Sequence, residues 1–551
     1  MNSHKPIIIS HVAVSFLHKI CFEDFSATIH PGHHIALIGD NGSGKSTLLS
    51  LLAGSVDTPH EGSIVISPDV VIGYLPQNMQ LDQDKTVWQV ATAGVAQIIE
   101  DLQQFELLAQ NMGQSDSSDD IYDQLLEKLV ASDAFSIENK IISFLQQMDL
   151  GNKKFDLVST LSGGQQILLG LVRILATGPN FLLLDEPTNH LDQSNREKLF
   201  SFLRSWDGTA IIVSHDTQLL RTWPKKVWDI KHGEIIVFDG TYADYVRERD
   251  IANDQQVNKI DQLKREKKKL AKEKEDDRAR EAQSKKMGEK KYANAPRVLR
   301  NDKREQAADT TARKRNIISG KQEAVSRQLQ DMYEHKVIVP KFDMGGQKQY
   351  GLLSVYEGSV GYGDHIIVHD INFTVQPGER VAFVGDNGAG KSTIFKALLD
   401  DNMRKGGEWQ VPAYKSIGYL DQKYSILGNA ATPFDLIKTV RPEWSIIEIR
   451  SFLNDFLFCK NEEVSAPTTT LSGGEKARLA LAYIAAQSPS LLLLDEVTNN
   501  VDITTRNHII AVLNQFPGMI VVISHDTDFL RAIGAERLFM VGNGIVTESV
   551  L

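Results

Sequence analysis

Continuous apolar runs of strand length recur along the chain, and each ends in a glycine-rich or acidic segment. The runs are Ile35–Ile38, Phe181–Leu184, Val381–Val384 and Leu491–Leu494. An uninterrupted apolar run of this length is typical of a strand buried on both faces of a parallel sheet. None approaches the roughly 20 apolar residues needed to cross a bilayer. We therefore predict two α/β domains and no membrane part.

The segments that follow these runs occur twice, in the same order. The loop Gly39–Thr47 returns as Gly385–Thr393, and the Leu-Ser-Gly-Gly motif beginning at Leu161 returns at Leu471. In both copies the aspartate after the next apolar run (Asp185 or Asp495) lies 24 residues beyond this leucine. The histidine of a Ser-His-Asp motif (His215 or His525) lies 30 residues further on. The chain is therefore an internal duplication.

Two segments lie outside the repeat. Between a shared glutamine and the Leu-Ser-Gly-Gly leucine, the first copy has 84 residues (Gln77 to Leu161) and the second 49 (Gln422 to Leu471). The extra stretch has helical spacing on either side of a turn-rich segment, which predicts a helical hairpin within residues 95–147.

The second segment, residues 246–340, joins the two copies and has a different charge from the rest. It holds 26 Lys and Arg against 17 Asp and Glu, a net of +9, whereas the whole chain is at −11 and the remainder at −20. Asn253–Gln283 predicts one helix of about 45 Å at 1.5 Å per residue, and Ala308–Met332 an antiparallel return. The stretch between them, Ser284–Ala307, is rich in Lys and Arg. This is either a solvated spacer or a basic tip for a polyphosphate partner.

The whole chain has 551 residues, of which 42% are hydrophobic and 24% charged. This length and composition are those of an ordinary globular protein with two or three domains. We assign residues 1–245 and 341–551 to the two copies and 246–340 to the linker. Cys21 and Cys459 are the only cysteines. We expect both to be buried and unpaired in a reducing cytoplasm.

The glycine-rich loops predict phosphate binding. Each follows an apolar strand and precedes a helix, so its backbone N–H groups and the helix N-terminus can surround a polyphosphate. In such a loop Lys45 and Lys391 reach the β- and γ-phosphates, and Ser46 and Ser392 ligate Mg²⁺. The Asp-Glu pairs supply the remaining chemistry: Asp185 and Asp495 for Mg²⁺, and Glu186 and Glu496 as general bases toward water.

With the duplicated Leu-Ser-Gly-Gly motif, the chain resembles the ATP-binding-cassette (ABC) ATPases, and each copy is hereafter called a cassette. The resemblance implies that the signature motif of one cassette closes the ATP site of the other, so that Ser472 faces Lys45 and Ser162 faces Lys391. It also implies that Gln77 and Gln422 contact Mg²⁺ and the lytic water and that His215 and His525 contact the γ-phosphate. The nucleotide-binding residues implied for the two cassettes are Phe16, Gly39, Asn41, Gly42, Gly44, Lys45, Ser46, Thr47, Ser162, Gly163, Gly164, Tyr362, Gly385, Asn387, Gly388, Gly390, Lys391, Ser392, Thr393, Ser472, Gly473 and Gly474.

Phe16 and Tyr362 belong to this set because each precedes its loop lysine by 29 residues. The shared spacing predicts that both rings stack on adenine. Taken singly, either ring would more often belong to a core.

Among ABC proteins the chain is similar to the ABC-F class, which has tandem cassettes, an arm in the first cassette and a charged helical linker. The run Asp185–Asp192 matches the extended motif of that class, and Gly240–Tyr245 matches its entry into the linker. The resemblance implies a cytoplasmic, monomeric ATPase on the ribosome. Its linker would meet ribosomal RNA and tRNA at the exit site, to modulate translation or to protect the ribosome from antibiotics. A transporter engine with a separate membrane subunit and a DNA-repair ATPase are the alternatives.

The second cassette departs from the class pattern at Val497 and Asn500, where the extended motif has proline and histidine. The first signature continues as Gln166–Leu169, without the basic residues of Lys476-Ala477-Arg478. With head-to-tail pairing, both departures fall on the site built on Lys391. We therefore expect the Lys45 site to hydrolyse ATP faster, unless these changes are neutral.

Overall fold

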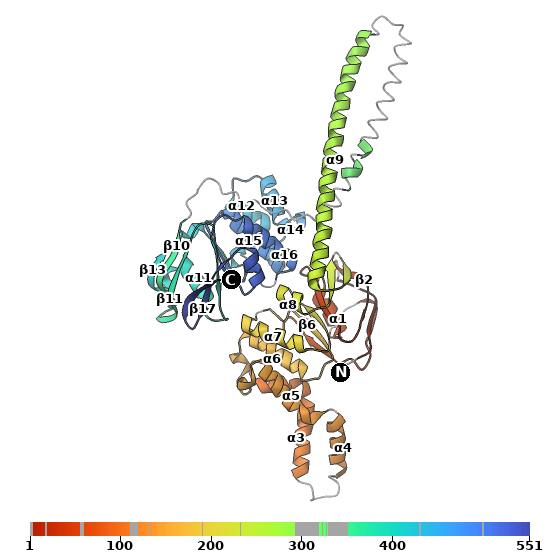
Figure 1. Cartoon of the computed structure of the whole chain (residues 1–551), viewed down its shortest axis with the longest axis vertical. Coiled ribbons are helices and arrows are strands. Elements are labelled where there is room, and N and C mark those ends of the chain that lie inside the picture. Colours follow the sequence, from red (N-terminus) through yellow and green to blue (C-terminus); the bar gives the residue numbers. More distant parts are fainter. Residues whose placement is uncertain are drawn as a thin grey trace. The chain divides into compact units, whose positions relative to one another are not determined.

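The structure is a computed structural model (Figure 1). The residues it describes are 4–16, 19–55, 60–110, 119–131, 133–189, 191–231, 233–291, 319–321, 323–326, 328, 351–428, 431–498 and 501–550.

Each cassette is built on a six-stranded sheet. In the first cassette the strand order is β5-β6-β7-β3-β8-β9, parallel except for the last pair, and the second cassette repeats it as β14-β15-β16-β12-β17-β18. The strands are β3 (His34–Gly39), β5 (Ile72–Leu75), β6 (Phe181–Asp185), β7 (Thr209–Val213), β8 (Lys226–Lys231), β9 (Glu234–Asp239), β12 (Arg380–Val384), β14 (Ile417–Leu420), β15 (Leu491–Asp495), β16 (Met519–Ile523), β17 (Arg537–Gly542) and β18 (Ile545–Val550). The predicted parallel strands are thus confirmed.

A second, three-stranded antiparallel sheet accompanies each central sheet, in the order β2-β1-β4 and β11-β10-β13. Its strands are β1 (Ile7–Phe16), β2 (Lys19–Ile29), β4 (Glu61–Val65), β10 (Leu353–Tyr362), β11 (His365–Val375) and β13 (Arg404–Gln410). The apolar residues of both sheets pack with the helix that follows the glycine-rich loop into one core, which fixes that helix against the sheet.

Helices cover the central sheets and carry the motifs at their N-termini. In the first cassette they are α1 (Lys45–Leu52), α2 (Val87–Thr92), α5 (Ala134–Gln147), α6 (Gly163–Leu175), α7 (Gln193–Ser205) and α8 (Thr217–Thr222). In the second they are α11 (Lys391–Leu399), α12 (Pro433–Val440), α13 (Ile446–Asp455), α14 (Asn461–Ser465), α15 (Gly473–Gln487), α16 (Ile503–Gln515) and α17 (Thr527–Ala532).

The predicted arm is present as α3 (Ala96–Gln110) and α4 (Asp119–Ala131) (Figure 1). The rings of Phe105 and Tyr122 stack with centroids 4.7 Å apart, and the Lys128 ammonium lies 2.5 Å from the Asp101 carboxylate. Aromatic stacking and an ion pair with one buried partner therefore join the two helices.

The linker forms a separate compact unit, Ala243–Val337. Its helix α9 (Tyr242–Lys291) has 50 residues, about 75 Å, and is longer than predicted at both ends. At the C-terminal end no proline interrupts it before Pro296. Lys274 Nζ lies 3.3 Å from Ser319 Oγ, and Val325 joins a buried cluster with residues nearer the start of α9, so this part of the return is antiparallel. The other residues predicted for the return and for the tip after Lys291 lie outside the described residues.

One prediction about the core is wrong. Cys21 is buried, but Cys459 is exposed. It follows the buried Phe458 in the short connection before α14, in which Lys460 is exposed as well. The predicted domain limits at 245, 246–340 and 341 stay a prediction.

Candidate functional site: two composite nucleotide sites

Both predicted lysines stand at the first position of a helix, directly after a left-handed glycine. Gly44 has φ 104° and Gly390 φ 102°, a region that glycine adopts without a Cβ clash. Lys45 Nζ donates to the carbonyl oxygens of Gly39 (2.8 Å) and Asp40 (2.9 Å). The ammonium is therefore held over the glycine-rich loop, where the phosphates of a nucleotide would take over these hydrogen bonds.

The second loop has the same geometry. Lys391 Nζ donates to the carbonyl oxygens of Gly385 (2.6 Å) and Asp386 (2.9 Å). Burial is the largest influence on both lysines and lowers their pKa, while neighbouring carboxylates, led by Glu186 and Glu496, act in the opposite direction. The other predicted loop residues lie in the same turns or in the first helical turn: Asn41, Gly42, Ser46, Thr47, Asn387, Gly388, Ser392 and Thr393.

The first residue of each loop admits only glycine. Gly385 has φ 147°, and a Cβ there would lie 2.1 Å from the carbonyl oxygen of Val541 on β17. We expect Gly385→Ala to destabilise the protein by roughly 1–3 kcal/mol, the cost of a strained backbone position, and to lower its thermal midpoint. Gly542→Ala is the matched control, because a Cβ at Gly542 meets nothing within 4 Å. Equal midpoints for the two variants would contradict this account.

The predicted carboxylates end equivalent strands in the sheets of the two cassettes. Asp185 closes β6 and Asp495 closes β15, and both are buried. Burial raises the pKa of each, while side-chain hydrogen bonds with Ser46 and Ser392 lower it. Asp185 Oδ1 is buried without a hydrogen-bond partner among the described residues. A carboxylate with a free oxygen beside a serine hydroxyl fits a hard cation whose other ligands are phosphate and water.

Each predicted general base follows its aspartate in a left-handed backbone conformation. Glu186 and Glu496 both have φ 52°, and their N–H groups donate to the carbonyl oxygens of Val213 and Ile523 at 2.9 Å. A non-glycine residue held at positive φ costs energy, and such strained positions are enriched at functional sites. The turn directs both carboxylates away from the strands that precede them.

In the first cassette the glutamate is deeply buried. Burial is the main cause that raises the pKa of Glu186 to about 7, and burial followed by the Lys45 charge lowers that of His215 to about 3. His215 Nε2 lies 3.2 Å from Glu186 Oε1. The pair thus places a neutral imidazole beside a carboxyl group that titrates near neutral pH, as a base toward water requires.

The second cassette is arranged differently. Gln422 Nε2 donates to Glu496 Oε2 at 3.2 Å, and His525 Nε2 lies 3.7 Å from Glu496 Oε1. Burial, then Lys391, lowers the pKa of His525 to about 4. The glutamate side chain is 18% exposed, against 6% for Glu186. Gln77, the counterpart of Gln422, is exposed after β5.

The signature serines begin helices. Ser162 caps α6 and Ser472 caps α15, each accepting from the backbone N–H three residues on at 3.3 Å. The glycines after each serine lie in the first helical turn, where N–H groups lack helical partners. In the second cassette the Ser472 hydroxyl also donates to Glu475 Oε2 at 2.7 Å.

Contacts between the cassettes join the first glycine-rich loop to the second cassette. The Asn41 N–H donates to Asp502 Oδ2 at 3.2 Å, and a Cβ on Gly474 would lie 3.7 Å from Asn41 Nδ2. Burial lowers the pKa of Lys391 and of His525, and the charge of Asp192 in the first cassette offsets a small part of that lowering in each. The second signature thus faces the first loop.

Sequence reasoning assigned no role to Asp192 or Asp502. Both cap helices, α7 and α16, and both stand seven residues after the aspartate that ends the apolar strand. That shared spacing could have identified them. The aromatic residues predicted for adenine, Phe16 and Tyr362, end β1 and β10 and are 47% and 48% exposed, so both rings are open to a ligand.

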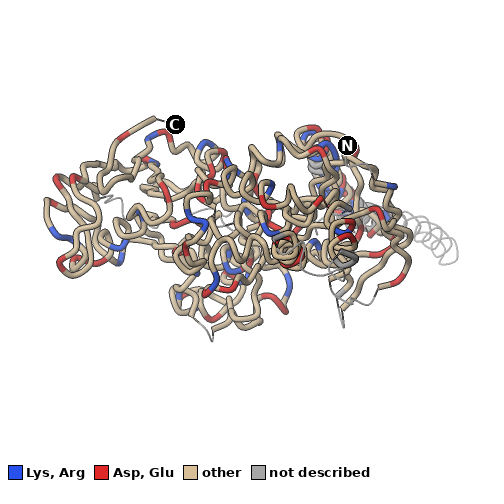
Figure 2. The backbone as a smooth tube through the Cα atoms, turned by 90° about the horizontal axis from the view of Figure 1, so that it is seen from below, with Lys and Arg blue, Asp and Glu red and all other residues tan. Residues whose placement is uncertain are grey.

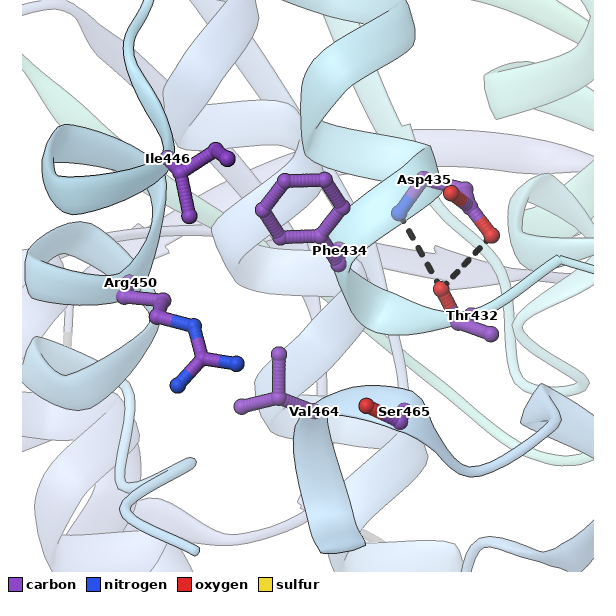
Figure 3. A pocket seen from close by; sticks show the side chains of 7 residues that line it. All are labelled: Thr432, Phe434, Asp435, Ile446, Arg450, Val464 and Ser465. Atoms are coloured by element: carbon purple, nitrogen blue, oxygen red, sulfur yellow. Dashed lines mark hydrogen bonds between the residues drawn. The ribbon is translucent and has the colours of Figure 1, made fainter. Parts of the chain in front are cut away.

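A cavity of about 350 Å³ lies elsewhere in the second cassette (Figure 3). It is lined by α12, α13 and α14, with Phe434 and Val464 as apolar walls and Arg450 at one side. None of its lining residues belongs to a motif described above, so it is separate from the nucleotide sites.

The comparisons with known proteins agree with this geometry. The family described as "ABC transporter" matches residues 22–189 and 368–499, together more than half of the chain. The Energy-dependent translational throttle protein EttA of Haemophilus influenzae is 28% identical over 95% of this chain and 90% of its own. The probable ATP-binding protein YheS of Escherichia coli is 29% identical over 95% and 76%. The chain belongs to the ABC transporter family and, within it, to the ABC-F class.

Solved structures share the tandem arrangement. The archaeal ribosome recycling factor aABCE1, in complex with stalk protein aP1, superposes with a TM-score of 0.57 at 15% identity, over 98% of this chain and 90% of that one. A structure titled "RNase-L Inhibitor" has the same TM-score and identity, over 98% and 91%. At such identity the likeness concerns the fold. As an ABC protein, the chain binds ATP and hydrolyses it. Among the helices described, none is long and apolar enough to cross a membrane.

Proposed function

We propose that this ABC-F ATPase acts on the ribosome in the cytoplasm as a monomer. ATP would close its two cassettes, and its linker would contact ribosomal RNA and tRNA at the exit site. The observation that carries the proposal is the long charged helix α9, placed between two complete cassettes. The similarity to EttA, named as a translational throttle protein, supports it.

The charge distribution supports the same partner. Acidic and basic positions are interspersed along the backbone of the cassettes (Figure 2), whose surplus is acidic, whereas residues 246–340 carry a net +9. A basic segment on an acidic protein favours contact with a polyphosphate backbone. Its finer role would be to modulate translation or to displace antibiotics.

Each composite site would hold MgATP. Ser46 and Asp185 would hold Mg²⁺ in one site and Ser392 and Asp495 in the other, with Gln77 and Gln422 near the ion; the bound ion neutralises charge on the phosphates. Glu186 and Glu496 would accept a proton from the lytic water. Phe16 and Tyr362 would stack on adenine, and the signature serines and glycines would donate to the γ-phosphate of the opposite cassette.

Co-sedimentation separates this proposal from the alternatives. An E186Q/E496Q double variant loaded with ATP should sediment with ribosomes and not with membrane vesicles or DNA. Association with vesicles alone would favour a transporter engine with a separate membrane subunit, and association with DNA alone a DNA-repair ATPase.

Charge reversal tests the linker tip. Replacing Lys285, Lys286, Lys290 and Lys291 by Glu should weaken ribosome association and make it less salt-sensitive, because fewer counterions are released when phosphate contacts are lost. ATPase activity without ribosomes should stay near that of the wild type.

The matched control makes the same change of charge on the shaft of α9. Lys267, Lys268, Lys269 and Lys272 are exposed, and their replacement by Glu should affect binding less than reversal at the tip. If both variants weaken binding equally, ribosome association depends on the net charge of the linker and not on charges at its tip. If neither changes the salt dependence, the linker is a spacer.

A further inference from the structure

The signature helix of the second cassette carries a half-buried arginine that bonds to the neighbouring helix α16. Arg478 stands on α15, six residues after Ser472, and its Nη1 donates to Thr505 Oγ1 at 3.1 Å. Its guanidinium carbon lies 5.9 Å from the Phe458 ring centroid. The Arg478 side chain therefore points toward α16.

Thr505 connects Arg478 to the nucleotide site of the first cassette. It is fully buried in the first turn of α16, and its N–H donates to Asp502 Oδ1 at 2.6 Å. The Thr505 side chain also hydrogen-bonds with Asp502, whose other oxygen accepts from the Asn41 N–H of the first glycine-rich loop at 3.2 Å. Arg478, Thr505 and Asp502 therefore form a continuous hydrogen-bonded series from the signature helix to the loop that holds Lys45.

Thr505 is the hydrogen-bond acceptor for the Arg478 side chain among the described residues. Among the described residues no carboxylate lies within ion-pair distance of the guanidinium, and its Nε is buried without a partner. His508, on α16, is 1% exposed, and burial, then the Arg478 charge, lowers its pKa to about 4. Neither ring nitrogen of His508 has a hydrogen-bond partner in the part of the chain that the structure describes, so this neutral imidazole takes no hydrogen bond from the guanidinium.

The first cassette lacks this series. The residue six positions after Ser162 is Leu168, which is fully buried. At the position of Thr505 stands Asn195, whose side chain accepts from Lys198 Nζ at 3.3 Å. The duplication therefore retained the helices but placed the arginine on one side only, in the cassette whose signature faces Lys45.

We propose that Arg478 is a positioning residue for ATP hydrolysis at the Lys45 site. Through Thr505 it fixes the position of Asp502 relative to Ser472. The N-termini of α16 and α15 therefore approach the first glycine-rich loop together. The Lys391 site, served by the first signature, does not depend on it.

Single-turnover hydrolysis in single-site backgrounds tests this role. In an E496Q background, which leaves Glu186 to act, R478L should slow hydrolysis by about tenfold or more, since small misplacements of closing elements are costly. The ATP concentration for half-maximal rate should change less than threefold. In an E186Q background R478L should change the rate less than twofold. R478K, which keeps a donor, should recover part of the lost rate.

A second pair of variants keeps the test valid should R478L fold poorly. Thr505→Val removes the hydroxyl while keeping the shape and should reproduce the R478L loss at the Lys45 site, whereas Thr505→Ser should retain activity. Combining R478L with T505V should cost no more than either alone, because both interrupt one series. An equal loss in the two backgrounds, or a Thr505→Val rate within twofold of the wild-type residue in the E496Q background, would overturn the proposal.

Discussion

An E186Q/E496Q double variant is expected to lose ATP turnover by more than about 10²-fold, the usual contribution of a general base. An amide keeps the shape of the side chain but accepts no proton from the attacking water. Both glutamates lie at the end of a buried strand with φ 52°, so the backbone turn that directs them should survive the substitution. Phosphate release measured in steady state gives the loss.

Nucleotide binding should survive in this variant. Equilibrium binding of a fluorescent ATP analogue is expected to stay close to that of the wild type, and the closed form should accumulate on the partner and inhibit translation. K45A/K391A is the contrasting variant, because it removes the ammonium groups above both loops and should lose binding itself. Near-normal turnover by the E186Q/E496Q protein would refute the assignment of these glutamates.

E186Q alone is expected to lose clearly more ribosome-stimulated ATPase activity than E496Q alone. The departures from the ABC-F sequence pattern, at Val497 and Asn500 and in the first signature, all belong to the Lys391 site. The described residues add a second difference. Burial raises the pKa of Glu186 to about 7, which suits a base, whereas Glu496 is more exposed and bonded to Gln422. The Lys45 site should therefore turn over faster, and the Lys391 site should hold ATP longer.

The comparison needs matched protein and ribosome concentrations, and the amount of bound ATP after a chase gives an independent measure. E186Q should retain ATP at the blocked Lys45 site and leave only the slow turnover of the Lys391 site. Equal losses by the two single variants, or a larger loss by E496Q, would show that the departures are neutral drift.

The sequence by itself determined the duplication, the buried parallel strands and the residues of both nucleotide loops. These features depend on short-range patterns: an apolar run long enough for one strand, glycines where φ is positive, and a helix start after the loop. It also predicted the arm and the presence of a long linker helix. It predicted that helix too short at both ends, and at the C-terminal end no proline marks a limit before Pro296.

Only the tertiary structure decided which groups meet across elements distant in the chain. Asp502 accepts from Asn41 across 461 positions of the chain, and Arg478 donates to Thr505 on a different helix. Burial, which the whole fold creates, sets the pKa of Glu186, and the same fold leaves Cys459 exposed. Motif spacing fixes which strand end a residue occupies. The direction of its side chain depends on packing between elements, which no local pattern encodes.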